Sequence, residues 1–236
     1  ETAFENPEGY HHAFGTREAQ PGGITKSLGE GWEIETQFAP KLMPGSHGIH
    51  TVVEAALNAI DGTSLAPEDI TSIAVTGPRW KSAYGLYQPR DLATASHSIP
   101  YFVARAMVAG KIGWDDLAQK RILDPAIQRL QDKVEIVEDA ALDPYDYPGG
   151  ATVVVTTAEG TQLTATVDHA PGTPQRGFSG EDIEAKDREL APRAGLSTLQ
   201  IEDSLSAFKC LEDIPDICNL MPCLVAGNPG ARRGKN

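Results

Sequence analysis

Residues 150–169 read GATVVVTTAEGTQLTATVDH, and this stretch limits the possible folds more than any other part of the chain. β-Branched residues alternate with smaller or polar ones on both sides of the central AEG. Alternation with a period of two is typical of a strand with one buried face, and a break at glycine is typical of a tight turn. The stretch therefore predicts an antiparallel hairpin. Two further strand patterns, DITSIAVTG and VEIVED, indicate a sheet of three or more strands.

Helical patterns lie between these strands. Apolar residues recur at helical spacing from Ser46 to a terminating Asp-Gly, and an apolar helix is expected over residues 101–111. A third helix is expected in DPAIQRLQDKV, where Asp124 is a suitable cap and Pro125 occupies the first helical position. The strands and helices of this block predict a small α+β domain.

Flanking segments indicate a second, helical domain. Ser179 followed by Asp182 marks the start of a helix, and two amphipathic helical segments follow it. The fold class predicted is α+β, with a small α+β domain inserted between segments of a helical domain. Residues 1–40 and 171–236 are assigned to the helical domain, and residues 41–170 to the inserted domain.

Composition excludes several classes of function. Acidic residues outnumber lysine and arginine by 33 to 20, and no clustered basic face precedes the terminal ARRGKN, so we expect no nucleic-acid partner. No apolar run approaches the ~18–20 residues of a membrane span, so we expect no membrane partner. Cys210, Cys218 and Cys223 lack zinc-site spacing and do not suggest a disulfide framework. These observations favour a reducing, cytoplasmic location.

Four local patterns then occur in one order. The segment LGEGWEIETQFAPKLMP contains Trp32 and places Lys41 three residues before Pro44. It is followed by HSIPY at the start of an apolar helix, by DKVEIVED before the hairpin, and by APGTPQRGFSGEDIEAK. Their order and spacing resemble the C-terminal half of the MmgE/PrpD family, which includes 2-methylcitrate dehydratase, cis-aconitate decarboxylase and iminodisuccinate epimerase. The resemblance spans nearly the whole chain and implies a ligand in the cleft between a helical domain and an inserted lid.

The resemblance also implies that the chain works with another one. The family members it resembles are much longer, and the part without a counterpart is the N-terminal half of the helical domain, which supplies several catalytic side chains. We therefore expect a partner chain that provides this half, or a homo-oligomer such as a dimer. The opening ETAFENPEGY has neither an initiator methionine nor a secretory layout, which suggests processing, trimming or subunit splitting.

For the binding site, the resemblance implies a small polycarboxylate substrate and neither metal nor cofactor. Lys41 matches the family's lysine before the proline and is expected to clamp a carboxylate. His47 and His50 begin the following helix, where backbone N–H groups favour an anion. His50 fits the family's histidine position better and is assigned a catalytic role, with His47 in substrate binding. Zinc is not expected, because no carboxylate or third histidine stands at ligand spacing.

The segment HSIPY carries the remaining predictions. Tyr101 matches the family's tyrosine, which implies that its hydroxyl donates to a substrate oxygen or transfers a proton. The alternative is a core tyrosine bonded to the backbone. Ser98 is expected to cap the helix, and His97 to face the cleft and contact substrate. A catalytic triad with Asp91 is rejected, because adjacent serine and histidine do not normally adopt the required geometry.

Several functions are consistent with these features. The leading expectation is a lyase of propionate metabolism that dehydrates a 2-methylcitrate-like substrate by moving a proton next to a carboxylate. Decarboxylation of a cis-aconitate-type substrate and epimerisation of a dicarboxylate are alternatives within the family. A non-catalytic subunit that completes a larger enzyme, or a binding module without turnover, remains a further alternative. In the subunit case, the apolar segment LEDIPDICNLMPCLV would form an interface.

Overall fold

The computed structural model of the chain describes residues 28–36, 38–78, 84–139 and 150–226. The chain divides into two compact units, residues 1–39 and 40–236. Within the first, the described residues include the short helix α2 (Glu33–Thr36). Most of the segment 1–40 that we assigned to the helical domain therefore lies outside the described residues.

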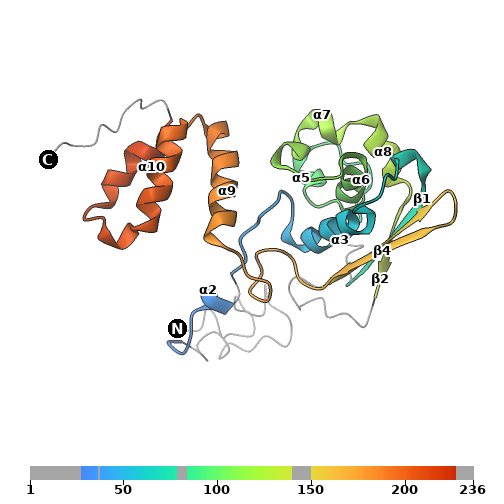
Figure 1. Cartoon of the computed structure of the whole chain (residues 1–236), viewed down its shortest axis with the longest axis horizontal. Helices are drawn as coiled ribbons and strands as arrows, with labels where there is room; N and C mark the ends of the chain where they lie inside the picture. Colours follow the sequence, from blue (N-terminus) through green and yellow to red (C-terminus); the bar gives the residue numbers. More distant parts are fainter. Residues whose placement is uncertain (1–27, 37, 79–83, 140–149, 227–236) are drawn as a thin grey trace, which may run out of the picture. The chain divides into compact units, whose positions relative to one another are not determined.

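The second unit contains a four-stranded sheet (Figure 1). Its strands are β1 (Ile70–Gly77), β2 (Val134–Glu138), β3 (Ala151–Thr157) and β4 (Gln162–Val167), in the order β2-β1-β3-β4. The hairpin β3–β4 and the pair β1–β3 are antiparallel, whereas β1 and β2 are parallel. A parallel pair needs a long crossover, and the helices between β1 and β2 provide it. The predicted hairpin and both additional strands are thus confirmed.

Strand register places the apolar residues on one face of the sheet. Val75 pairs with Ile136 on one side and with Val153 on the other, and all three side chains are buried. On the opposite face Thr152 and Thr166 pair, and their hydroxyl oxygens lie 2.8 Å apart. The alternation therefore produces one apolar face for packing and one polar face.

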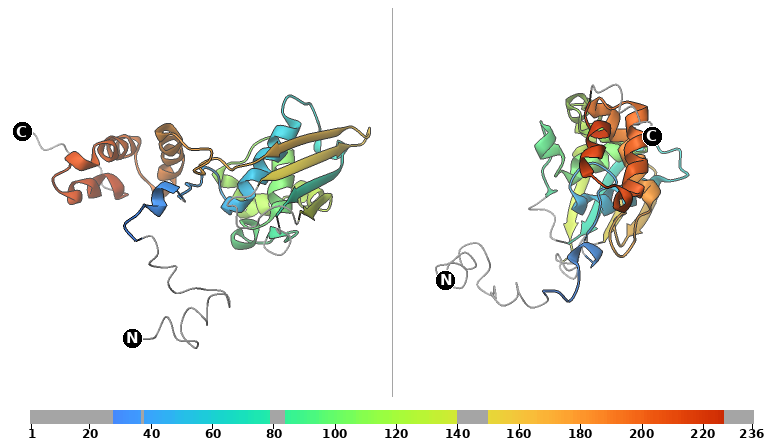
Figure 2. Two further views of the ribbon diagram at one scale, coloured as in Figure 1. Left: turned by 90° about the horizontal axis from the view of Figure 1, so that it is seen from below. Right: turned by 90° about the vertical axis from the view of Figure 1, so that its left-hand side faces the viewer.

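Three helices cover the apolar side of the sheet. A short 3-10 turn, η2 (His47–Ile49), leads into α3 (His50–Ile60), which packs against β3 and β4. Helix α6 (Ile99–Ala109) packs against α3 and β2, and α8 (Pro125–Gln131) packs against α6 (Figure 2). Val52 and Val53 of α3 are fully buried, and burial of one such side chain contributes roughly 1.5–3 kcal/mol.

The other elements are short or belong to the C-terminal segment. Between Ala66 and Leu123 lie η3 (Pro67–Asp69), α5 (Leu92–Ala95), η4 (Trp114–Leu117) and α7 (Gln119–Ile122). The C-terminal segment contains α9 (Gly180–Leu190), η5 (Ala191–Ala194), α10 (Thr198–Lys209), η6 (Leu211–Asp213), η7 (Ile217–Leu220) and α11 (Met221–Leu224). Helix α10 packs against α9 and α11. No helix within the described ranges combines the length and the apolar character needed to cross a membrane.

Helix starts follow the local capping chemistry. The Ser98 hydroxyl accepts a hydrogen bond from the Tyr101 backbone N–H (3.1 Å), and the Asp124 carboxylate accepts one from Ala126 N–H (2.9 Å). Ser179 forms a reciprocal capping box with Asp182. Each cap satisfies a backbone donor that the helix leaves free, at a gain of about 1 kcal/mol. The three caps predicted from the sequence are confirmed.

Candidate functional site

The start of α3 brings two of the predicted site residues together. His47 lies in the 3-10 turn and His50 begins the α-helix, so the two imidazoles occupy consecutive turns. Their ring centroids are 4.6 Å apart in a T-shaped arrangement. The side chains are only 3 % and 1 % exposed, respectively. Lys41, six residues before His47, is exposed.

His50 has an unusual hydrogen-bonding state. Neither ring nitrogen has a hydrogen-bond partner among the described residues. A neutral imidazole carries one donor and one acceptor, and leaving such groups buried without partners costs about 1–3 kcal/mol each. Most buried polar groups in proteins are paired, so an exception calls for an explanation. A binding site is one such explanation, because a ligand then provides the partners.

Both histidines are neutral at pH 7. The pKa of His50 is lowered to about 3, mainly by burial and in smaller part by the nearby His47 and Lys41. The Pro44 carbonyl opposes this shift in the pKa, although it does not meet the geometry of a hydrogen bond to either ring nitrogen. Burial also lowers the pKa of His47, again with Lys41 contributing. The site therefore combines a lysine with two uncharged imidazoles.

The turn that follows β4, at Pro171 and Gly172, contacts the chain on both sides of Lys41. His47 Nε2 lies 3.3 Å from the carbonyl oxygen of Pro171, and the next residue, Gly172, packs against the carbonyl of Pro40. Gly172 has a φ of +88°, and a Cβ there would overlap the Pro40 oxygen. The same turn is joined to α3 by an ion pair between Arg176 and Glu54. Close contact at glycine therefore sets the position of the backbone next to Lys41.

Replacing Gly172 by alanine is expected to lower the free energy of unfolding by about 1–3 kcal/mol through backbone strain, and further through the clash with Pro40. Gly62→Ala is the matched control, because Gly62 also has a positive φ but has nothing within 4 Å of a new Cβ. Urea unfolding of both variants separates strain from clash. Equal losses in the two variants would contradict the proposed close contact.

Tyr84 also belongs to this region, and the sequence patterns did not identify it. Its hydroxyl lies 3.1 Å from the Ser46 hydroxyl, which donates to it. A Cβ on Gly48 would lie 2.9 Å from the same phenolic oxygen. The Tyr84 ring is stacked parallel to His97 at a centroid distance of 6.3 Å. Small residues on both sides of His47 were the available signal, because they leave room for another side chain to approach.

The structure places His97 at the edge of this group. Its Nδ1 lies 2.9 Å from the Ser96 hydroxyl and 3.2 Å from the Ala93 carbonyl oxygen, and the side chain is exposed. Through its stacking on Tyr84, His97 is connected with the region around the start of α3. Its predicted contact with substrate stays a prediction.

Tyr101 belongs to α6, and its side chain lies in the hydrophobic core of the domain. The side chain is fully buried, and its hydroxyl donates to the backbone carbonyl of Asp116. The Asp116 carboxylate in turn accepts a 2.7 Å bond from Arg105 Nε and a 2.7 Å bond from Gly113 N–H. Burial raises the pKa of the Tyr101 hydroxyl well above its ordinary value. These contacts match the alternative of a core tyrosine bonded to the backbone, and a catalytic role for Tyr101 stays a prediction.

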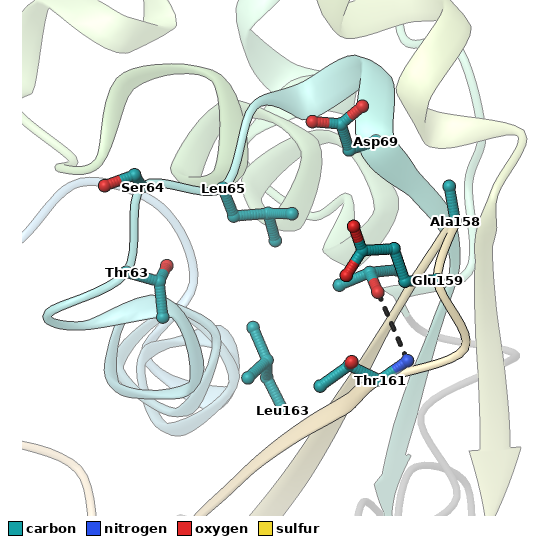
Figure 3. A pocket seen from close by; sticks show the side chains of 9 residues that line it. Thr63, Ser64, Leu65, Asp69, Ala158, Glu159, Thr161 and Leu163 are labelled. Carbon is teal, nitrogen blue, oxygen red and sulfur yellow. Dashed lines mark hydrogen bonds between the residues drawn. The ribbon is translucent and has the colours of Figure 1, made fainter.

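A separate hollow lies beyond the other end of α3. It has a volume of about 440 Å³ and is lined by the loop after α3 and by the β3–β4 turn, with Thr63, Asp69 and Glu159 around it (Figure 3). Helix α3 has 11 residues, so its two ends are about 15 Å apart. Two carboxylates make this hollow unfavourable for an anion. The start of α3 is therefore the better site for a carboxylate ligand.

Chemically, the region at the start of α3 offers a cation, two neutral imidazoles and a phenol. The ammonium of Lys41 can hold an anionic group, an imidazole can accept or donate a proton, and a phenol can donate to a developing oxyanion. Within the described parts of the chain, no three histidine, cysteine or acidic side chains are grouped so that they could hold a metal ion. The arrangement suits proton transfer on an anionic substrate.

Comparison with known proteins identifies the family of the chain. The family model described as MmgE/PrpD C-terminal domain matches residues 43–207. This range includes the sheet, its covering helices and most of the C-terminal helical segment. A search of curated proteins finds no match. Since the family model covers more than half of the sequence, the chain belongs to the MmgE/PrpD family and contains its C-terminal domain.

Proposed function

We propose that the chain forms the carboxylate-binding part of a lyase acting on a small polycarboxylate, with dehydration of a 2-methylcitrate-like substrate as its reaction. The observation that carries this proposal is the state of His50, which is buried and neutral and is influenced by the charge of Lys41. Neither of its ring nitrogens has a hydrogen-bond partner among the described residues. Membership of a family that includes lyases supports the same reading.

In the proposed reaction, Lys41 binds a substrate carboxylate and holds the adjacent carbon near His50. The bound carboxylate raises the pKa of the neutral imidazole, which removes a proton from this carbon. The electron pair forms the new double bond as the C–O bond on the neighbouring carbon breaks. The departing hydroxyl takes up the proton that His50 received and leaves as water, which returns the imidazole to its neutral form. Tyr84 donates a hydrogen bond to the negative charge that develops on the carboxylate, which stabilises the transition state.

The same groups are compatible with two other outcomes. In a decarboxylase the bond between carbon and a carboxylate breaks, CO₂ leaves, and a proton is delivered to the carbon framework that keeps the electron pair. In an epimerase the proton that was removed is replaced by one on the opposite face of the same carbon. Proton transfer next to a carboxylate is common to all three reactions. We put dehydration first, and product analysis by NMR with 2-methylcitrate, cis-aconitate and a chiral dicarboxylate distinguishes them.

We further propose that the C-terminal helices complete a helical domain with a partner chain or a second copy. In this arrangement residues 41–170 form the inserted lid. Large apolar side chains are exposed in the C-terminal segment, namely Leu199, Phe208, Leu211, Ile217, Met221, Leu224 and Val225. Helices that expose this many large apolar side chains are expected to cover them in an interface. Light scattering of the chain alone, and with an N-terminal MmgE/PrpD half, tests the assembly; a monodisperse, active monomer would contradict it.

Replacing Lys41 by alanine is expected to weaken binding of 2-methylcitrate more than tenfold, because the ammonium is the cation of the proposed site. Isothermal titration calorimetry on the assembled enzyme measures this change. Lys111→Ala is the control, because Lys111 is also an exposed lysine but lies just beyond the end of α6. Equal affinities of the Lys41 variant and the wild type would refute the anchor role. Binding without product would instead favour a module that has lost turnover.

A further inference from the structure

The loop that follows Tyr84 is attached to the rest of the domain by several side chains. The Ser98 hydroxyl donates to the Leu86 carbonyl (2.5 Å), and the Tyr87 hydroxyl donates to the Val134 carbonyl (2.7 Å). The backbone N–H of Gln88 donates to the side-chain oxygen of Gln131 (2.8 Å). These contacts hold the loop against α6, α8 and β2.

Gln88 has a strained backbone. Its φ is +51°, and it is the one non-glycine residue with a positive φ in the described part of the chain. Such a conformation is unfavourable for an L-residue and persists only where the surroundings enforce it. The partner that holds its N–H is the side-chain amide of Gln131. Strain of this kind is concentrated at functional sites, and Gln88 is four residues from Tyr84.

Gln131 is itself unusual. It is the last residue of α8 and is fully buried, and its side-chain nitrogen has no hydrogen-bond partner among the described residues. A buried amide with an unpaired donor destabilises the fold, and an apolar side chain of similar size would avoid this loss. Its oxygen, however, is used to hold the strained turn.

We propose that Gln131 is a positioning residue, which acts through the strained turn at Gln88 to hold the Tyr84 hydroxyl beside Ser46 and the start of α3. This inference rests on the proposed function for the role of Tyr84 in turnover. The placement of Tyr84 itself depends only on the contacts described above. Among the described residues, no hydrogen bond joins Gln131 to Lys41 or to the two histidines. Replacing Gln131 should therefore lower turnover without weakening carboxylate binding.

The test uses Gln131→Met in the full chain, assembled as the active enzyme. The matched control is Gln128→Met on the same helix, which loses a 2.7 Å bond to the Ile122 carbonyl but does not contact the loop after Tyr84. Protein labelled with 3-fluorotyrosine is followed by ¹⁹F NMR, and the Tyr84 signal is assigned by its absence in Tyr84→Phe. We expect Gln131→Met to shift or broaden this signal and to lower kcat about tenfold, with the Kd for 2-methylcitrate within twofold of wild type.

Rescue provides a second readout. Gln131→Glu keeps an oxygen that can accept from Gln88 N–H, and it should restore the Tyr84 signal toward its wild-type position. A folded Gln131→Met protein with an unchanged Tyr84 signal would overturn the positioning role. So would an equal effect in Gln128→Met. A shifted Tyr84 signal in a protein that turns over no polycarboxylate would support positioning while refuting the proposed function, so the two failures are distinguishable.

Discussion

Tyr84→Phe is expected to lower kcat for a 2-methylcitrate-type substrate about 100-fold in the assembled enzyme, with little change in KM. Loss of one well-placed donor to a developing oxyanion, or of one proton-transfer group, has effects of this order. The hydroxyl lies beside Ser46 and Gly48 at the start of α3, whereas the anchor for the substrate is Lys41. Turnover and binding should therefore separate in steady-state kinetics.

The matched variant is Tyr101→Phe. It leaves the Asp116 carbonyl without the hydroxyl that bonds to it in the core, so we expect the free energy of unfolding to fall by about 1–3 kcal/mol. Turnover per folded molecule should change little. The opposite result, a stable Tyr101→Phe protein without turnover together with an active Tyr84→Phe protein, would support the catalytic role of Tyr101 that the family resemblance implies.

A second large effect is expected in the acid stability of the domain. The pKa of His50 is about 3 in the folded chain, against an ordinary value near 6.5 in the unfolded chain. Between these two values the unfolded state binds more protons, so the stability contributed by the neutral imidazole is complete above about pH 6.5 and is lost as the pH falls toward 3. The expected slope is up to ~1.4 kcal/mol per pH unit, which amounts to ~2 kcal/mol between pH 6.5 and 4.5.

His50→Leu removes this dependence of stability on pH. The leucine cannot be protonated and leaves no buried nitrogen without a partner, so the variant should be at least as stable as wild type at pH 7 and should lose less stability in acid. Urea unfolding at pH 7 and pH 4.5 measures the difference. His97→Leu, which removes an exposed histidine, is expected to keep the wild-type acid loss. Parallel pH profiles for wild type and His50→Leu would show that His50 is not the acid-sensitive group.

Binding of a carboxylate should also change the pKa of His50. A carboxylate bound near Lys41 and His50 adds negative charge, which favours the protonated imidazole and raises its pKa. The pKa measured with ligand should consequently exceed that of the free protein. This reciprocal effect connects the acid stability of the free domain with the carboxylate site.

The secondary structure could be predicted because its causes are local. Alternation in 150–169 depends only on neighbouring residues, and the strand pairing then follows from the short turn that joins the two strands. The caps at Ser98, Asp124 and Ser179 likewise involve partners two or three residues away. Patterns of this range are present in the linear sequence and need no knowledge of the final packing.

Part of the candidate site could also be predicted from a local motif. Lys41, His47 and His50 lie within ten residues of one another, so a motif could identify them together, and the structure brings the two histidines into contact. What the motif could not show is their environment. The low pKa of His50 follows from its burial, and its ring nitrogens have no partner among the described residues. Segments distant in sequence contact the start of α3, through Pro171 at His47 and through Tyr84 at Ser46.

The choice between the two tyrosines shows the limit most clearly. The resemblance to the family indicated Tyr101, because it matches the family's tyrosine in the segment HSIPY at the start of an apolar helix. Whether a helical side chain faces a site or the core depends on the rotation of the helix, and α6 buries Tyr101 against Asp116. Tyr84 reaches Ser46 across 38 positions, through a loop held by the distant Gln131. The sequence alone thus specified the elements and the cationic segment, because those depend on near neighbours, whereas tertiary packing decided which hydroxyl stands beside them.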